Sequence, residues 1–190
     1  NIQCTYYMIK WIREIPSCQN GIGEDAVLLG KLYCFLEQEP QAEVNIPDGF
    51  ILPSSDIESL FKADNVIDDV HALISNVEDH GVDIDVMADN IKKMFMSSVL
   101  DPITLDDIHQ HFNMLKDSGA KELTVHPSYI YSDPETYSAS DHQQSFYKIE
   151  SFDDLLIAVR QVYASLFDKR ALVFYQQRHL DVKKIAVSIR

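Results

Sequence analysis

The sequence predicts an α+β fold in which helices dominate and a small mixed sheet completes the domain. Several stretches repeat apolar residues every three or four positions, which is the spacing of helices that bury one face. Short β-type segments lie between these stretches, at 122–125, 146–149 and 184–189. The 190 residues are 46% hydrophobic and 24% charged, an ordinary composition for a globular protein. We therefore expect residues 1–190 to form a single domain.

Residues 24–39 are predicted to form the first helix. Its core-facing positions include Ala26, Leu29 and Tyr33, which share one helical face, and Pro40 ends the pattern. An extended segment is expected at 44–52.

Residues 54–118 are predicted to be a helical insertion. Ser54 opens a run of N-cap candidates for a helix that reaches about Ala63. A second helix is expected at 65–79, and a third is marked by apolar residues from Ile84 to Phe95. The last one is predicted to run from Thr104 to Asp117, because Thr104-x-x-Asp107 resembles a capping box.

The last third of the chain changes character. A strand is predicted at 122–125, and residues 127–145 are expected to form a long loop because they are rich in Ser, Tyr, Asp and Gln without a helical period. A strand at 146–149 then leads into the clearest helix of the chain, capped by Ser151-Phe152-Asp153-Asp154. A further helix is expected from Asp168 to about His179, and a strand at 184–189.

The formal charge of −14 excludes two classes of partner. Residues 21–100 carry 16 acidic and 4 basic side chains, so most of the negative charge lies there. Such a surface repels nucleic-acid backbones and anionic membranes. No apolar run approaches the roughly 20 residues that span a bilayer. Three cysteines without a CxxC pair indicate reduced thiols in a cytoplasmic protein.

The segment Val125-His126-Pro127-Ser128-Tyr129 opens a series of motifs that resemble one family. Ser132-Asp133 follows, then Asp141-His142-Gln143-Gln144-Ser145-Phe146, then a helix that reads Tyr163-Ala164-Ser165-Leu166-Phe167-Asp168-Lys169-Arg170-Ala171. These residues resemble the V-R-S-S-A, E-D, G-Q-Q-[DE]-T-[YF] and W-A-S-L-F-x-x-R-A motifs of phosphoenolpyruvate synthases and pyruvate phosphate dikinases. The motifs belong to the N-terminal, ATP-grasp-like nucleotide-binding domain of that family.

The N-terminal half resembles the same domain. Gly21-Ile22-Gly23-Glu24 is similar to the glycine-led G-G-K entry of the family's first helix, and Ile46-Pro47-Asp48-Gly49-Phe50 is similar to its V-P-x-G-F segment. The resemblance implies the first subdomain of the nucleotide-binding region. The magnesium-binding residues of the family and its phosphohistidine and pyruvate-binding domains would lie beyond residue 190. Since the chain begins at Asn1 and not at Met, we expect a trimmed, processed or excised piece.

The resemblance implies a nucleotide site at Glu24, His126, Ser128, Asp133 and Gln143. Three positions depart from the family pattern. Glu24 stands where the family has a phosphate-binding lysine, His126 stands where it has an arginine, and Asp141 stands where it has a glycine. A carboxylate near a triphosphate is repulsive, and a neutral imidazole lacks the guanidinium fork. Pro127 also removes a backbone donor.

Three functions remain open at this point. The first is a degenerate, catalytically inactive domain that acts as a binding or regulatory module. The alternative is the N-terminal fragment of a divergent ATP-dependent phosphotransferase, and only this alternative requires ATP and magnesium. An acidic interaction protein that keeps the fold without a nucleotide role is a third reading. We predict no catalytic residue and no metal ligand, and we expect a protein partner or self-association at an exposed sheet edge.

Individual residues have structural alternatives. Glu24 also suits a helix N-terminus, His126 suits a hydrogen-bonded structural role, and Arg170 suits an ion pair with Asp168 or a more distant carboxylate. Three further sets are the histidines 109 and 111, the tyrosines 129, 131 and 137, and the cysteines 4, 18 and 34. The histidines point to different sides of a helix and cannot share one metal ion. The tyrosines either form an aromatic binding surface or pack the long loop, and the cysteines are expected to be buried thiols.

Overall fold

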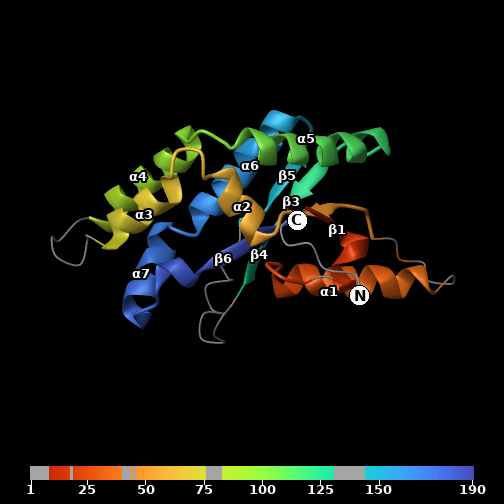
Figure 1. Ribbon diagram of the computed structural model, residues 1–190. Coiled ribbons are helices and arrows are strands. Elements are labelled where there is room, and N and C mark those ends of the chain that lie inside the picture. The colour runs from red at the N-terminus through yellow and green to blue at the C-terminus, as the bar shows by residue number, and fades with distance from the viewer. Residues whose placement is uncertain (1–8, 18, 40–43, 45, 76–82, 131–143) are drawn as a thin grey trace.

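A computed structural model of the chain describes residues 9–17, 19–39, 44, 46–75, 83–130 and 144–190 (Figure 1). Runs of helices and of short strands follow one another along it, which confirms the α+β class. The α-helices are α1 (Glu24–Glu37), α2 (Ser54–Leu60), α3 (Val66–Ser75), α4 (Ile84–Ser97), α5 (Pro102–Asp117), α6 (Phe152–Ser165) and α7 (Lys169–Arg178). The strands are β1 (Lys10–Trp11), β2 (Phe50–Ile51), β3 (Leu123–Val125), β4 (Pro127–Ile130), β5 (Phe146–Ile149) and β6 (Ala186–Ile189), and two 3₁₀ turns are η1 (Ile12–Ser17) and η4 (Val182–Lys184).

The strands form antiparallel pairs, which corrects the expected mixed sheet. In the described residues β1 pairs with β2, β3 with β5, and β4 with β6. The extended stretch 123–130 changes partner at His126, so its two halves join different strands. Leu52 bridges to Ile189 and thereby connects the end of β2 to β6. The result is a set of short pairs at the centre of the molecule, between α1 and the other helices (Figure 1).

The prediction of a long loop at 127–145 is wrong at its start, because residues 127–130 form β4. Pro127, Ser128 and Tyr129 are buried there. Proline lacks an N–H donor but is tolerated as the first residue of a strand, and Pro127 holds that position. Residues 131–143, the rest of the expected loop up to Gln144, lie outside the described residues.

Two predicted helix starts have different outcomes. Ser151 and Asp154 form the expected capping box, in which each side chain accepts a hydrogen bond from the other's backbone N–H. The box predicted at Thr104 is wrong. The helix begins earlier, because Asp101 caps it by accepting from the Thr104 N–H at 2.9 Å, and Pro102 occupies the first position.

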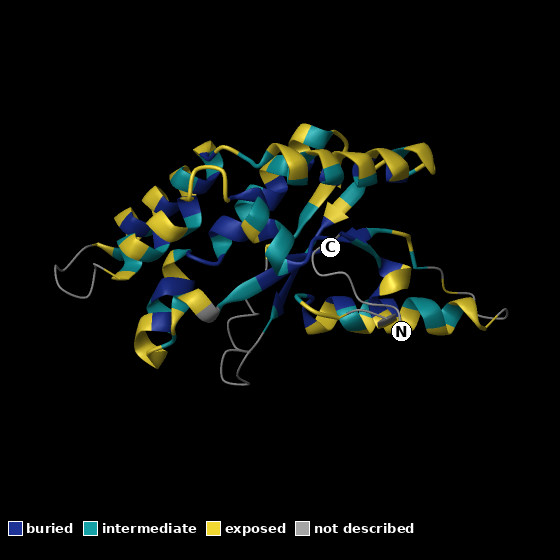
Figure 2. Ribbon diagram, viewed as in Figure 1, coloured by how far each residue is buried: buried dark blue, intermediate teal, exposed yellow. Residues whose placement is uncertain are grey.

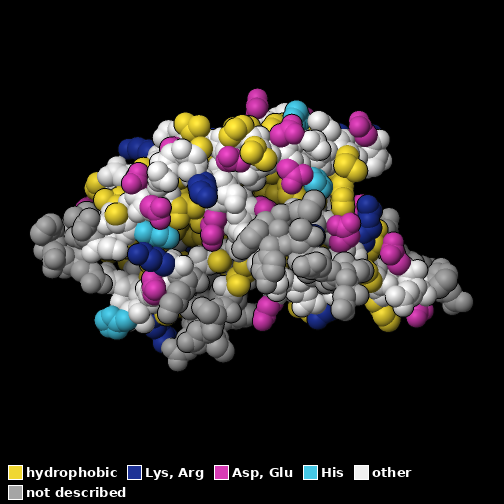
Figure 3. All heavy atoms as spheres, in the orientation of Figure 1, with side chains coloured by type: hydrophobic (Ala, Val, Ile, Leu, Met, Phe, Trp, Pro, Cys, Tyr) yellow, Lys and Arg dark blue, Asp and Glu magenta, His cyan; other side chains and the backbone are white. Residues whose placement is uncertain are grey.

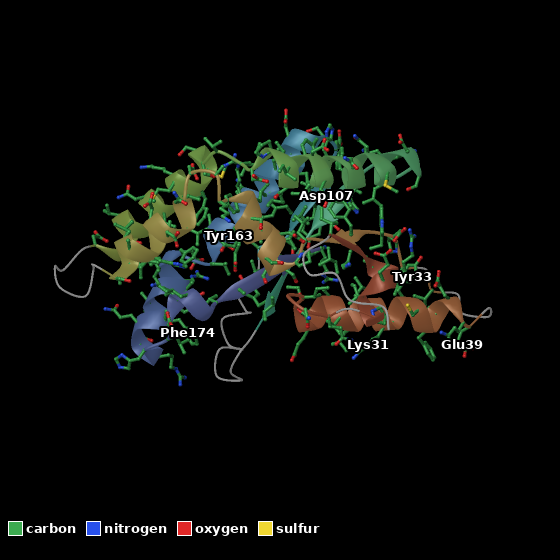
Figure 4. All side chains as sticks on the ribbon, in the orientation of Figure 1. Lys31, Tyr33, Glu39, Asp107, Tyr163 and Phe174 are labelled. Atoms are coloured by element: carbon green, nitrogen blue, oxygen red, sulfur yellow. The ribbon has the colours of Figure 1, made fainter. Side chains whose placement is uncertain are left out.

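Most of the core lies around α4 and α6 (Figure 2). We call its centre the aromatic cluster: Phe61, Phe95, Tyr163 and Phe167, with neighbouring ring centroids 5.1–5.8 Å apart. Figure 4 shows Tyr163 inside the molecule, between the helices. Arg160 of α6 adds a polar connection, since its guanidinium donates to the carbonyl oxygens of Phe95 and Ser98 at 2.6 and 2.9 Å. These bonds satisfy carbonyls at the C-terminal end of α4.

A second, smaller core holds α1 against η1. Its buried members are Ile12, Ile15, Ile22, Ala26 and Ile51. Gly30 allows the close approach, because a Cβ there would lie 2.8 Å from the Cβ of Ile15 and 2.9 Å from the carbonyl oxygen of Ile12.

Candidate functional site

The N-terminus of α1 docks on the β4–β6 pair through two buried serines, which we call the serine ladder (Ser128 and Ser188). The Gly23 N–H donates to Ser188 Oγ at 2.9 Å, and the Ala26 N–H donates to Ser128 Oγ at 3.2 Å. The Ser188 hydroxyl in turn donates to the Ser128 carbonyl oxygen at 3.1 Å. Both serines are fully buried. Two N–H donors at the helix start, of the kind that binds phosphate in other proteins, are thus satisfied by the protein itself.

Gly23 is required by this contact. Its backbone is extended, so its φ angle is open to any residue. A Cβ at this position, however, would lie 2.6 Å from the carbonyl carbon of Ser128. The glycine therefore fixes how closely α1 approaches β4, and with it the position of Glu24.

His126 and Arg190 extend the pairing of β4 with β6 by one residue on each strand. Each accepts the other's backbone N–H, at 2.8 and 2.9 Å. Because they lie two residues from Ser128 and Ser188, their side chains leave the strands on the same face as the serine ladder. His126 Nδ1 lies 2.7 Å from Ser145 Oγ, and its ring meets Tyr147 edge-on at 5.8 Å.

Burial lowers the pKa of His126, and the positive charge of Arg190 lowers it further. The imidazole is therefore neutral at neutral pH. A neutral ring with one nitrogen already hydrogen bonded is a weak phosphate ligand compared with an arginine. At this position the chain offers a hydrogen-bonding group in place of a fixed positive charge.

A pocket of about 430 Å³ opens beside His126. Its walls are mostly apolar, from the 46–50 segment, α1, α5, β3 and α6. His126, Arg190, Asp48 and Glu122 are its ionisable lining residues. Asp48 is paired with Arg13 at 2.8 Å, and the Arg190 Nε is buried with no hydrogen-bond partner in the part of the chain that the structure describes. Apolar walls with a few polar groups are typical of sites for small molecules.

The structure brings together only part of the predicted nucleotide site. Glu24 is exposed in the first turn of α1, where a carboxylate favours the helix dipole. Ser128 is buried under the same helix, and His126 lines the pocket. Asp133, Asp141 and Gln143 lie outside the described residues.

Ser188 and Arg190 were missed by the sequence reasoning. Both lie on the predicted strand 184–189 or directly after it, at alternating positions that share one face. That alternation could have placed them together. The sequence held no sign that their partners would be Gly23 and His126.

Other candidate residues have structural roles. Tyr129 is buried, so it packs the core and forms no aromatic surface, while the tyrosines 131 and 137 lie outside the described residues. Asp168 caps α7 by accepting the Ala171 N–H at 2.7 Å, and these two described neighbours, Asp168 and the exposed Arg170, form no ion pair. His111 contacts Asp107 of its own helix at 3.3 Å. Cys34 is partly exposed where a buried thiol was expected, and cysteines 4 and 18 are not described.

Comparison with known proteins decides the family. The family described as "Pyruvate phosphate dikinase, AMP/ATP-binding domain" matches residues 23–190. The chain belongs to this family. The match begins at Gly23, where α1 docks on the serine ladder, and it includes Glu24, His126 and both serines of the ladder.

The curated relatives are much longer than this chain. The phosphoenolpyruvate synthase of Helicobacter pylori is 23% identical over 186 residues, which cover 95% of this chain and 22% of that protein. The phosphoenolpyruvate synthase of Pseudomonas aeruginosa is 26% identical over 152 residues, with 77% and 19% covered. The probable phosphoenolpyruvate synthase of Methanothermobacter thermautotrophicus is 21% identical over 187 residues, with 96% and 27% covered. The chain thus spans about a fifth to a quarter of their length.

Within the described ranges, every helix is too short or too polar to cross a bilayer.

Proposed function

We propose that residues 1–190 are a single domain of the pyruvate phosphate dikinase AMP/ATP-binding type that has lost its own phosphate-binding groups and acts as a cytoplasmic binding or regulatory module. Residues 54–118 would be a helical insertion in this domain. The N-terminus of α1 carries the proposal. Its N–H groups at Gly23 and Ala26 are bound by the serine ladder, and the adjacent side chain is the exposed carboxylate of Glu24.

The electrostatics at this end of α1 support the same proposal. A nucleoside triphosphate bound there would lie near the Glu24 carboxylate and the neutral ring of His126. Like charges repel and the imidazole supplies no compensating cation, so the bound state loses most of its electrostatic stabilisation.

Isothermal titration with ATP and magnesium tests the proposal on the native chain and on the double variant Glu24→Lys/His126→Arg. The expected result is no measurable heat for the native chain and a gain of binding in the variant. Asp117→Lys/His109→Arg is a matched control, because it makes the same change of charge at two exposed positions of α5. Micromolar binding by the native chain, or equal gains in both variants, would contradict the proposal.

A second function follows from the relatives. All the proteins named above are called phosphoenolpyruvate synthases or probable ones, and this chain covers only part of each. We therefore also consider the N-terminal fragment of a divergent ATP-dependent phosphotransferase, whose magnesium ligands and phosphohistidine would lie beyond residue 190. A parent gene that continues into a T-x-G-G-x-x-x-H-like motif would favour this function over the first.

A further inference from the structure

α1 carries three large hydrophobic side chains that face solvent. Leu28, Leu32 and Phe35 are 62%, 48% and 59% exposed. Their spacing of four and then three residues places them on one face of the helix. We call these three residues the apolar stripe. Single exposed apolar residues are ordinary, but three in a row on one helix form a continuous surface that favours a contact.

The opposite face of α1 is already in use. Ala26 and Gly30 are buried against η1, so α1 is apolar on two sides, and the described residues cover only one of them. Figure 4 shows this division, with Tyr33 on the side of α1 toward η1 and Lys31 and Glu39 on the outer side. A helix with an apolar outer face as well as an apolar inner face is expected to contact two neighbours.

Carboxylates stand at both ends of the apolar stripe. Glu24 and Asp25 precede Leu28, and Glu39 follows Phe35 by four residues, one helical turn. All three acids are exposed. The Glu39 N–H donates to the Leu36 carbonyl oxygen at 3.1 Å, so the helical turn continues to this residue. Lys31 is the single basic residue in the sequence of α1, and the face is net acidic.

We propose that the apolar stripe docks an amphipathic helix with Lys or Arg residues at both ends of its own apolar face. The apolar side chains would supply the buried area, and the carboxylates would pair with the flanking cations of the partner. The apolar stripe is separate from the serine ladder and the pocket at His126, and Glu24 is the one flanking acid shared with the predicted nucleotide site, so the inference does not rest on the proposed nucleotide chemistry.

Charge argues against a second copy of the chain as the occupant. Whether two α1 helices pack parallel or antiparallel, the acids at their ends meet acids. Acidic side chains also lie scattered among the hydrophobic ones over the visible face of the molecule (Figure 3), and each chain carries a formal charge of −14. Both features disfavour self-association and favour a basic partner.

The probe is a fluorescein-labelled synthetic helix of about 18 residues, a length that spans Glu24 to Glu39 at about 1.5 Å per residue. It carries leucines at helical spacing and lysines at both ends. Fluorescence anisotropy compares the native chain with Leu28→Ser/Leu32→Ser/Phe35→Ser. A matched control, Ile103→Ser/Met114→Ser, removes apolar residues of α5 that are 80% and 55% exposed. None of these changes alters the net charge.

We expect the stripe variant to weaken binding at least tenfold, a factor of ten corresponding to about 1.4 kcal/mol, while the α5 control binds as the native chain does. A second peptide with glutamates in place of the lysines is expected to bind at least tenfold more weakly. Equal affinity of native chain and stripe variant would overturn the proposal, as would equal affinity of the two peptides. Circular dichroism and thermal unfolding show whether the stripe variant is folded, and Leu32→Ser alone serves as a milder variant.

Analytical ultracentrifugation addresses the alternative occupant. The native chain is expected to sediment as a monomer at concentrations where it binds the lysine peptide. A dimer that the stripe variant dissociates would identify a second copy as the occupant and overturn the proposal of a basic partner.

Discussion

The aromatic cluster around α4 and α6 and the serine ladder beneath α1 are stabilised by different kinds of contact. The aromatic cluster consists of large side chains on helices, each presented by a local apolar pattern. The serine ladder consists of two hydroxyls, a glycine and backbone groups that come from distant parts of the chain; Gly23 and Ser188 are 165 residues apart. The stability of the aromatic cluster depends on the volume that its side chains fill. The stability of the serine ladder depends on a few hydrogen-bonded atoms at fixed distances.

The largest effect is expected in the aromatic cluster. Phe95 is fully buried and contacts three other rings, so Phe95→Ala should lower the free energy of unfolding by about 3–5 kcal/mol. Urea denaturation measures the change. Tyr147→Ala is the control, because that ring is 65% exposed and its loss should cost within about 0.5 kcal/mol. Similar losses for the two variants would mean that the cluster is not the main core.

A single methyl group added at Gly23 should destabilise the contact between α1 and the serine ladder. Gly23→Ala places a Cβ 2.6 Å from the Ser128 carbonyl carbon, so α1 must move, at a cost of about 3 kcal/mol. Gly49→Ala is the matched control, because its Cβ would meet only the end of the Ile12 side chain at 3.0 Å. Chemical denaturation of both variants gives the comparison. A native-like stability of Gly23→Ala would show that α1 is not held against β4.

Loss of the Ser128 hydroxyl should lower the free energy of unfolding less than the Gly23→Ala substitution does. Ser128→Ala removes the acceptor of the Ala26 N–H and leaves this buried donor without a partner, at a cost of about 2 kcal/mol. A double-mutant cycle with Ser188→Ala tests whether the two serines act together. Coupling is expected, since the Ser188 hydroxyl donates to the Ser128 carbonyl oxygen. Strictly additive losses would contradict a connected ladder.

The difference between local contacts in the aromatic cluster and long-range contacts in the serine ladder also explains what the sequence could predict. α6 was predicted with its cap, because Ser151, Asp154 and the apolar spacing are all local signals. β4 was missed, because Pro127 and Ser128 resemble loop residues until β6 and α1 supply their partners. The start of α5 was misplaced because two local signals compete. Thr104 begins a sequence that resembles a capping box, but Asp101 is the residue that caps α5. Of the candidate site, the family motifs indicated Glu24, His126 and Ser128 but not the pocket, whose walls come from segments far apart in sequence.

The smallest effect concerns Asp56, in the first turn of α2. The pKa of Asp56 is raised from 3.8 to about 6, chiefly because burial disfavours the charged carboxylate; the nearby carboxylate of Asp107 contributes to the rise, and Lys10 opposes it. Its Oδ2 is buried and has no hydrogen-bond partner among the described residues. A pKa that is higher in the folded state favours the protonated form, so this contribution to stability is complete below about pH 4 and is lost as the pH rises through about 6.

Asp56→Asn removes this titration and should stabilise the chain above pH 6 relative to the native protein. Because the side chain is partly exposed, we expect only about 1 kcal/mol at pH 8 and no gain at pH 4. Urea unfolding at the two pH values measures the difference, with the exposed Asp117→Asn as control. Parallel pH profiles for native chain and variant would show that α2 and α5 do not enclose an ionisable carboxylate. A gain confined to high pH would instead show that the buried Asp56 makes stability depend on pH, whereas the serine ladder does not, because its hydroxyls do not titrate.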